Sequence, residues 1–196
     1  LVNIISLGEI STDTIDFKRL MIDTNDLSDT TITANDLFVL LYTSGTTSSP
    51  KGVPHRYNNF LTNARLCCEE YGFTQKDKLL SVAPMTHLYG LFTYNMTLAA
   101  GATSVLLPGF SPEAFVNVVK TQRPTAIFAA PAHFASCFQQ KLLKQADFES
   151  VKFICLSGST VMPDLAKDVD RLLRRILSLT DLPTKTDVAF VAGAHA

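Results

Sequence analysis

Apolar residues gather in short continuous runs along this chain, and polar, glycine-rich or proline-rich stretches separate the runs. A run that is apolar at every position predicts a strand buried on both faces of a sheet, whereas apolar residues spaced three and four apart predict a helix. The predicted strands are Leu37–Tyr42, Leu79–Ala83, Thr103–Leu107, Thr125–Ala129, Val151–Leu156 and Val188–Val191.

Helices are predicted between these strands. Gly72 and Gly101 each follow a helical segment and predict its end, while Ser111 before Pro112 predicts an N-cap and a first turn. Alternating strands and helices predict βαβ units, and therefore an α/β fold with a mainly parallel sheet flanked by helices. The predicted helices are Asn58–Tyr71, Leu88–Ala100, Ser111–Thr121, Pro131–Lys144 and Met162–Leu177.

The pattern also divides the chain. Residues 1–35 are polar and are interpreted as a linker or partial N-terminal element, residues 36–178 as the core, and residues 179–196 as an atypical tail. The start at Leu1 lacks the basic and apolar regions of a signal peptide, so a cytoplasmic location is expected. No charged residue occurs between Lys78 and Glu113, but prolines and glycines interrupt this stretch, which favours a buried α/β segment over a membrane span.

Composition narrows the picture further. The 196 residues are 46% hydrophobic and 18% charged, which predicts a well-packed core. The net charge of −1 gives no electrostatic basis for binding nucleic acid. The cysteines lack the spacing of metal ligands, so no metal site is predicted, and we interpret them as reduced core residues: Cys67, Cys68, Cys137 and Cys155.

The most informative segment is Thr43–Gly52, a run of small hydroxyl residues and glycine that ends in a lysine and a glycine. Backbone N–H groups, small hydroxyls and one cation are what a polyphosphate requires from a protein without a large positive charge. We expect the preceding strand to place this loop at the carboxyl end of the sheet, where α/β proteins bind ligands. The predicted phosphate-binding residues are Thr43, Ser44, Gly45, Thr46, Thr47, Ser48 and Lys51.

A Walker P-loop is the competing interpretation, because Gly45 and Lys51 have its spacing. Pro50 stands where that motif needs its second glycine, and Gly52 where it needs a hydroxyl, so the motif fails. The loop instead resembles the Thr-Ser-Gly-Thr-Thr-Gly-x-Pro-Lys-Gly signature of the acyl-activating superfamily of acyl–CoA synthetases, peptide-synthetase adenylation domains and luciferases. Ser48 replaces the usual glycine, which strains the loop if this position needs a positive φ and is harmless if it needs only a small residue.

Two later segments carry the same resemblance. Pro84–Gly90 is similar to a family motif that presents an aromatic residue or histidine to the acyl pocket, which implies that His87 is catalytic, in addition to Lys51. Leu156–Met162 is similar to the segment that wraps the adenine, which implies contacts from Gly158, Ser159 and Thr160. The predicted helix that carries His133, Phe134 and Cys137 either lines the acyl pocket or belongs to the core.

The resemblance implies part of the large N-terminal domain of an ATP-dependent carboxylate–CoA ligase, which uses ATP, Mg²⁺ and CoA. Its substrate would be a carboxylic acid, as in fatty acid metabolism, with medium-chain, alicyclic or aromatic acids favoured. A peptide-synthetase adenylation domain is the alternative within the superfamily. A non-catalytic nucleotide-binding or interaction remnant is the alternative outside it.

Several family features do not follow residue 176, where the resemblance stops. These are the Tyr-Gly-x-Thr-Glu motif, the ribose-binding aspartate, and the C-terminal domain with its lysine. We therefore interpret the chain as a fragment that is weakly active or inactive by itself, since much of the electrostatic preorganisation for adenylation is missing. The apolar surface left uncovered would favour association with other chains, without fixing an oligomeric state.

Overall fold

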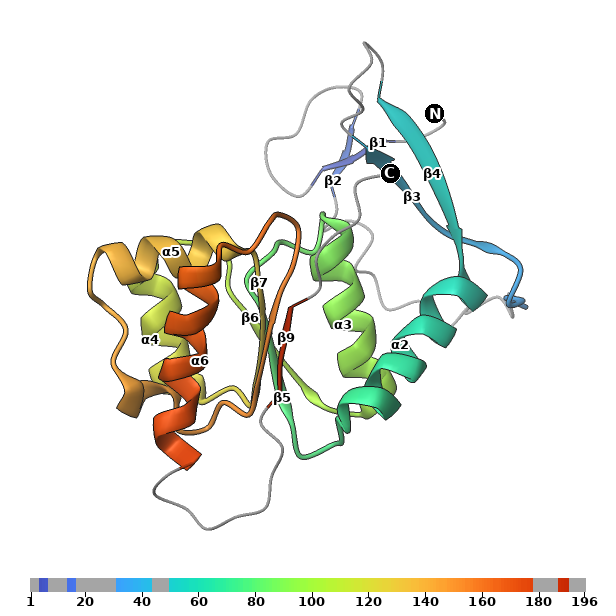
Figure 1. The fold of residues 1–196 in the computed structure, drawn as a ribbon. Coiled ribbons are helices and arrows are strands. Elements are labelled where there is room, and N and C mark those ends of the chain that lie inside the picture. The colour runs from blue at the N-terminus through green and yellow to red at the C-terminus, as the bar shows by residue number, and fades with distance from the viewer. Residues whose placement is uncertain (1–3, 7–13, 17–30, 44–49, 178–186, 191–196) are drawn as a thin grey trace. The chain divides into compact units, whose positions relative to one another are not determined.

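A five-stranded parallel sheet forms the centre of the larger part of the molecule (Figure 1). The computed structural model describes residues 4–6, 14–16, 31–43, 50–177 and 187–190. These fall into two compact units, residues 1–33 and residues 34–196. In the first unit, β1 (Ile4–Ser6) pairs in parallel with β2 (Thr14–Asp16). The second unit contains the candidate functional site.

The sheet has the strand order β6-β5-β7-β8-β9, and every neighbouring pair is parallel. This confirms the predicted α/β class. The strands lie close to the predicted runs: β5 (Lys78–Ser81), β6 (Thr103–Leu106), β7 (Ala126–Ala129), β8 (Phe153–Leu156) and β9 (Asp187–Phe190).

Helices cover both faces of the sheet, with α2 and α3 on one face and α4, α5 and α6 on the other (Figure 1). Alternate residues of each strand therefore enter different cores. On β7, Phe128 packs in the core under α2 and α3, whereas Ile127 packs in the core under the other three helices. The helices are α2 (Tyr57–Tyr71), α3 (Leu88–Ala100), α4 (Pro112–Gln122), α5 (Pro131–Gln139) and α6 (Pro163–Leu177).

The helix ends follow local chemistry. Gly72 and Gly101 end α2 and α3 in the left-handed conformation, with φ of 67° and 64°. The Ser111 hydroxyl accepts a 3.1 Å hydrogen bond from the Ala114 N–H at the start of α4. These ends agree with the sequence prediction.

Helix α5 is shorter than predicted. It ends at Gln139, and the chain continues through Lys141 at a φ of 54° into the 3-10 helix η1 (Gln145–Phe148). Phe148 is fully buried, with its ring 6.4 Å from that of Phe134. Burial of this aromatic side chain favours a turn over continuation of the helix.

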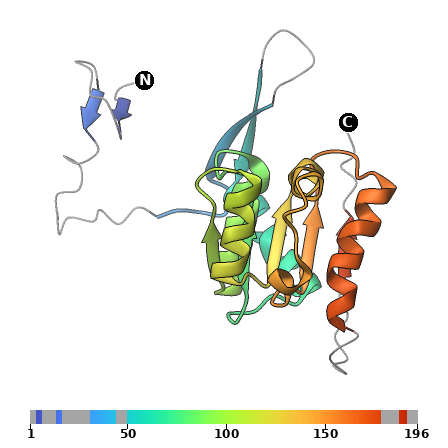
Figure 2. The same cartoon turned by 90° about the vertical axis from the view of Figure 1, so that its left-hand side faces the viewer.

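The apolar run at Leu37–Tyr42 is a strand, but the prediction that it is buried on both faces is wrong. Among the described residues, this strand, β3 (Leu37–Thr43), pairs with β4 (Lys51–Arg56) alone, in antiparallel orientation (Figure 2). Tyr42 is 68% exposed. Residues 44–49 therefore connect the two strands of a separate ribbon, and do not follow a strand of the parallel sheet as expected. Strand β4 was not predicted, because Gly52 and Pro54 are typical of turns.

Candidate functional site

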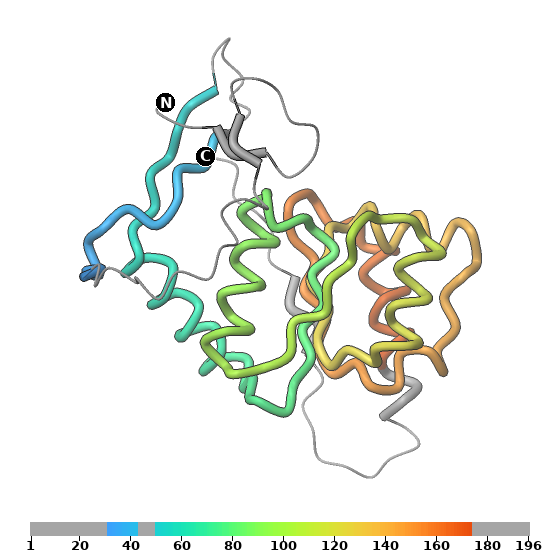
Figure 3. The backbone as a smooth tube through the Cα atoms, turned by 180° about the vertical axis from the view of Figure 1, so that it is seen from behind, coloured from blue at the N-terminus to red at the C-terminus, as the bar shows by residue number. Residues whose placement is uncertain are grey.

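The order of the sheet strands places a crevice at their carboxyl ends. From β5 the chain passes through α3 to β6, on one side of β5. It then returns through α4 to β7, on the other side of β5. Because the connections after β5 and β7 leave in opposite directions, a crevice opens between these two strands, which is where α/β proteins bind ligands. From the end of β5 the chain passes through residues 82–87 and turns back into α3, which runs alongside the sheet (Figure 3).

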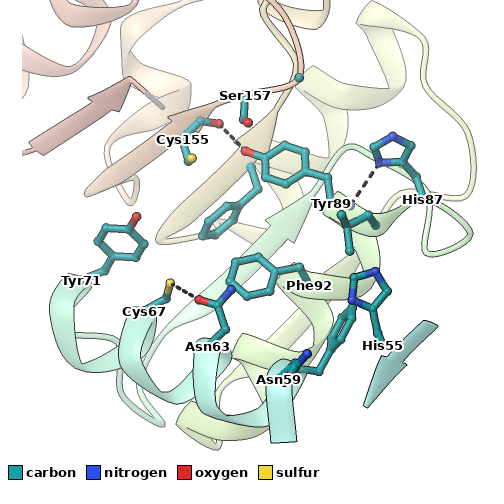
Figure 4. Close-up of a pocket in the computed structure, with 14 residues that line it drawn as sticks. His55, Asn59, Asn63, Cys67, Tyr71, His87, Tyr89, Phe92, Cys155 and Ser157 are labelled. Atoms are coloured by element: carbon teal, nitrogen blue, oxygen red, sulfur yellow. Dashed lines mark hydrogen bonds between the residues drawn. The ribbon is translucent and has the colours of Figure 1, made fainter. Parts of the chain in front are cut away.

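A cavity of about 600 Å³ lies on the face of the sheet covered by α2 and α3. Its lining includes His87 from the segment after β5, and Ser157 and Gly158 from the segment after β8. The sequence-predicted residues His87 and Gly158 are therefore brought to one cavity. Figure 4 shows His87 and Tyr71 at opposite ends of it.

One wall of the cavity is a single ridge of helix α2. It consists of Asn59, Asn63, Cys67 and Tyr71, spaced four residues apart. Residues at this spacing lie on one helix face, and twelve residues of α-helix rise about 18 Å. The Cys67 thiol donates to the Asn63 side-chain oxygen at 3.5 Å, so two members of the ridge are linked.

Aromatic side chains form much of the opposite wall. Tyr89 and Phe92 come from α3, and Phe128 comes from β7. The Tyr89 hydroxyl donates a 3.0 Å hydrogen bond to the backbone carbonyl of Cys155 on β8. Burial raises the pKa of the Tyr89 hydroxyl well above its usual range, so this donor keeps its proton.

His87 is the N-cap of α3. Its Nδ1 accepts a 3.1 Å hydrogen bond from the Tyr89 N–H, which requires an unprotonated Nδ1 and leaves the proton on Nε2 of the neutral ring. A side chain at Gly90 would place its Cβ 2.2 Å from the Pro84 carbonyl oxygen. Only glycine permits this close approach, which fixes the start of α3 and with it the cap residue.

Gly158 has a φ of 93°, a conformation that other residues rarely adopt. It lets the chain turn sharply after β8 at the edge of the cavity, beside Ser157. Ser159 and Thr160 are exposed and do not line the cavity. Backbone groups of this turn can reach a ligand that lies across the carboxyl ends of the strands.

The predicted phosphate-binding residues are only partly described. Ser44, Gly45, Thr46, Thr47 and Ser48 lie outside the described residues. Thr43 and Lys51 are paired across the ends of β3 and β4, and Lys51 is exposed. Lys51 is not among the described residues that line the cavity.

The structure also tests the predictions for the helix that carries Phe134 and Cys137 and for the cysteines. Phe134 and Cys137 belong to the core on the far face of the sheet, not to the cavity. All four cysteines are free, and Cys68, Cys137 and Cys155 are buried, as predicted. The prediction that Cys67 is a core residue is wrong, because it is only partly buried and lines the cavity. Sequence reasoning missed Asn59, Asn63 and Tyr71. Together with Cys67 they recur every four residues along a predicted helix, which was a visible signal.

Charged groups do not line this cavity among the described residues, and no cluster of His, Cys, Asp and Glu there could hold a metal ion. The described part of the chain also contains no helix with the length and apolar character that crossing a bilayer requires. The cavity is therefore suited to an uncharged, largely apolar group, with hydrogen-bonding residues at its rim.

Comparison with known proteins decides the lineage. The AMP-binding enzyme family matches residues 4–181. This chain belongs to that family. Its members are adenylate-forming enzymes, so the family predicted from the sequence is confirmed. The match extends on both sides of residues 36–176.

The similar curated proteins include CoA ligases. The chain is 33% identical over 132 residues to a long-chain-fatty-acid–CoA ligase of Bacillus subtilis, covering 66% of this chain and 23% of that protein. It is 28% identical over 172 residues to a medium-chain fatty-acid–CoA ligase of Escherichia coli, covering 86% of this chain and 30% of that protein. The chain thus spans less than a third of the length of these relatives.

Solved structures give the same fold. O-succinylbenzoate coenzyme A synthetase of Bacillus subtilis, in complex with AMP, matches with a TM-score of 0.70 and 27% identity, covering 81% of this chain and 33% of that one. Apo MatB from Rhodopseudomonas palustris matches with a TM-score of 0.63 and 25% identity, covering 82% and 29%. The chain therefore has the architecture of part of an adenylate-forming domain.

Proposed function

We propose that this chain supplies the acyl pocket and part of the ATP site of a carboxylate–CoA ligase. The observation that carries the proposal is the cavity of about 600 Å³, which joins an aromatic interior to a rim formed by His87 and Gly158. The names of the curated relatives, which include feruloyl-CoA synthase and indoleacetate–CoA ligase, support this reaction class.

The reaction would proceed in two steps. A carboxylate oxygen of the acid attacks the α-phosphorus of ATP, a new P–O bond forms, and pyrophosphate leaves with the electron pair of the broken bond. The CoA thiol then attacks the acyl carbon, AMP leaves, and the thiol proton passes to solvent. Holding the acid and the nucleotide in one site converts the first step into a reaction within a complex.

We assign the residues as follows. The Nε2–H of His87 orients the carboxylate at the rim, because Nδ1 is held by the Tyr89 N–H. The turn at Gly158 borders the adenine, together with Ser159 and Thr160. Lys51 and the hydroxyls of the preceding loop hold the outer phosphates, since a lysine and small hydroxyl residues suit a polyphosphate.

ATP brings Mg²⁺ to enzymes of this class, where the ion offsets phosphate charge. The described cavity residues include no carboxylate ligand, so they do not fit a resident Mg²⁺ site. No step of the proposed reaction is therefore assigned to a metal held by these residues.

The acyl group would occupy the space between α2 and the sheet. Its walls favour a medium-chain, alicyclic or aromatic acid, because aromatic side chains stabilise such groups by burial. A cytoplasmic location fits the use of ATP and CoA as substrates.

The test is acid-dependent exchange of labelled pyrophosphate into ATP by the protein that carries this chain. A panel of fatty, alicyclic and aromatic acids is compared with a reaction without acid, and thioester formation is then followed after CoA is added. His87→Ala is expected to lower exchange about a hundredfold.

Calorimetry with a non-hydrolysable acyl-adenylate analogue provides the second arm. Binding of the analogue together with exchange supports the ligase. If the protein binds ATP but none of the acids supports pyrophosphate exchange, the proposed reaction is wrong and the chain is a nucleotide-binding remnant. If neither ATP nor the analogue binds, the nucleotide site itself is absent.

A further inference from the structure

The end of the cavity away from His87 contains a group of weakly polar side chains. Tyr71 and Cys67 are one helical turn apart on α2, and Cys155 faces them from β8 (Figure 4). The rest of the interior is mostly aromatic. A polar side chain at the far end of an apolar pocket is suited to recognising one polar group of a ligand through a hydrogen bond.

The Tyr71 ring is held in place by its neighbours. Its centroid lies 4.8 Å from that of Phe153 and 5.7 Å from that of Phe73. Both contacts are tilted aromatic pairs, which are favourable geometries. The direction of the Tyr71 hydroxyl is therefore set by packing and does not depend on a ligand.

Within the described part of the chain, the Tyr71 hydroxyl makes no hydrogen bond. By contrast, the Tyr89 hydroxyl is engaged by the Cys155 carbonyl, and the Cys67 thiol by Asn63. Burial, and then the neighbouring Cys67 and Cys155 thiols, raise the pKa of the Tyr71 hydroxyl, so it is a neutral donor at neutral pH. A half-buried hydroxyl without a protein partner is stabilised by a ligand group that can accept or donate a hydrogen bond.

The charge of that ligand group is restricted by the lining. The described cavity residues include no Asp, Glu, Lys or Arg. An anionic group at the far end would lose its hydration, gain no counter-ion, and face the charge of Glu70, which also raises the pKa of Tyr71. A neutral hydroxyl or ether oxygen meets no such penalty.

We propose that Tyr71 is a specificity-determining residue that hydrogen-bonds an uncharged oxygen at the far end of a ring-bearing acyl group. The proposal rests on the proposed ligase function and narrows its substrates to cyclic acids with a hydroxyl or ether substituent opposite the carboxylate. Phe92 and Phe128 supply the faces between which the ring packs. Asn59 and Asn63 lie nearer the start of α2 and do not take part in this contact.

The experiment compares matched acids in the adenylation assay of the protein that carries this chain. Benzoic, phenylacetic and phenylpropanoic acids are each used with and without a para-hydroxyl, and para-carboxylated acids serve as charged analogues. The wild-type protein is expected to favour the hydroxylated member of at least one pair about tenfold in kcat/KM, the effect of one hydrogen bond. The charged analogues are expected not to react.

Tyr71→Phe is the decisive variant, because it removes the hydroxyl and keeps the ring that packs on Phe153. It is expected to abolish the preference by lowering kcat/KM for the hydroxylated acid about tenfold more than for the unsubstituted acid. Tyr94→Phe on α3 is the matched control, because Tyr94 does not line the cavity, and it should retain the preference.

Two results would overturn the assignment of Tyr71. One is a wild-type protein that adenylates these acids without preferring any hydroxylated member. The other is a Tyr71→Phe variant that keeps the full preference. Absence of pyrophosphate exchange with every acid, hydroxylated or not, would instead reject the ligase function on which the assignment rests.

Discussion

The Tyr89 hydroxyl donates a 3.0 Å hydrogen bond to the backbone carbonyl of Cys155, and thereby ties α3 to strand β8 of the sheet. Tyr89 lies two residues after His87, whose Nδ1 accepts the Tyr89 N–H. One residue thus connects the interior wall of the cavity to the histidine at its rim.

Replacement of Tyr89 by phenylalanine tests this connection. Loss of the hydroxyl leaves the Cys155 carbonyl without that partner, and we expect the free energy of unfolding to fall by about 1–2 kcal/mol. Denaturant unfolding of the variant measures the change, with Tyr94→Phe on the same helix as the control. An unchanged stability would mean that the bond contributes nothing to the fold.

Gly158→Ala should destabilise the turn after β8. The φ of 93° strains a residue with a Cβ by about 1 kcal/mol or more, although no atom lies within 4 Å of the added methyl group. If this turn borders the adenine, the KM for ATP should also rise. Gly109→Ala is a matched control, because its added Cβ also meets nothing within 4 Å and the expected effect is small.

The thiol of Cys67 should report occupancy of the cavity. Burial, and then the charge of Glu70, raise the pKa of this thiol, so alkylation at neutral pH is slower than for an ordinary thiol. Its rate should rise about tenfold for each pH unit until the pKa is reached, because only the thiolate reacts.

A bound carboxylic acid should slow the alkylation of Cys67, which mass spectrometry of the labelled peptide measures. Cys67→Ser is the control and should remove the labelling at this site. Labelling that is equally fast with and without an acid that supports pyrophosphate exchange would place the acyl group elsewhere.

His133 should make stability depend on pH. Burial lowers the pKa of its imidazole, whose Nδ1 accepts a 3.1 Å hydrogen bond from the Ala130 N–H. The unfolded state therefore binds a proton more readily, and the contribution of the neutral ring is present above the unfolded pKa of about 6.5 and lost as pH falls through the lower folded pKa.

Unfolding of the wild type and of His133→Asn between pH 8 and about pH 5 measures this contribution. Asparagine keeps an acceptor for the Ala130 N–H but does not titrate. The wild type should lose more stability than the variant on acidification. Parallel curves would show that His133 is not responsible.

Lys51→Ala tests the proposed phosphate contact. Removal of a cation that stabilises developing charge costs about a hundredfold or more in rate, and we expect this loss in pyrophosphate exchange with little change in the free energy of unfolding. Lys76→Ala is the matched control, since Lys76 is exposed in the turn before β5. Equal rates for the two variants would remove Lys51 from the site.

Local chemistry made much of the fold predictable. Glycines that favour a left-handed conformation end α2 and α3, and Ser111 caps α4, so these boundaries depend on residues adjacent in sequence. The buried strands of the parallel sheet were also predictable, because a strand between two helical layers is apolar at every position. The exposure of β3 was not predictable, since the burial of a strand depends on which strand becomes its partner.

The candidate site was predictable only where a motif marks it. His87 and Gly158 follow strands in recognisable segments, whereas Tyr71 and Asn63 belong to a helix whose role depends on how it packs over the sheet. The Cys68 thiol, for example, donates to the Met96 carbonyl of α3 at 3.2 Å, and such contacts between elements set the position of the α2 ridge. The four-residue spacing in the sequence shows that the residues of the α2 ridge share one helix face, but it does not show which part of the fold that face packs against.

The close approach at Gly90 makes the two walls of the cavity unequal in stiffness. A shift of α3 towards β5 would press its backbone into the carbonyls of Ala83 and Pro84, which already lie within 2.6 Å of where a Cβ would be. Helix α3 is therefore the fixed reference of the pocket. Under the proposed ligase function, a bulkier acyl group is therefore expected to displace α2, and adaptation to new substrates should arise first through residues that position α2 and only later through those around His87.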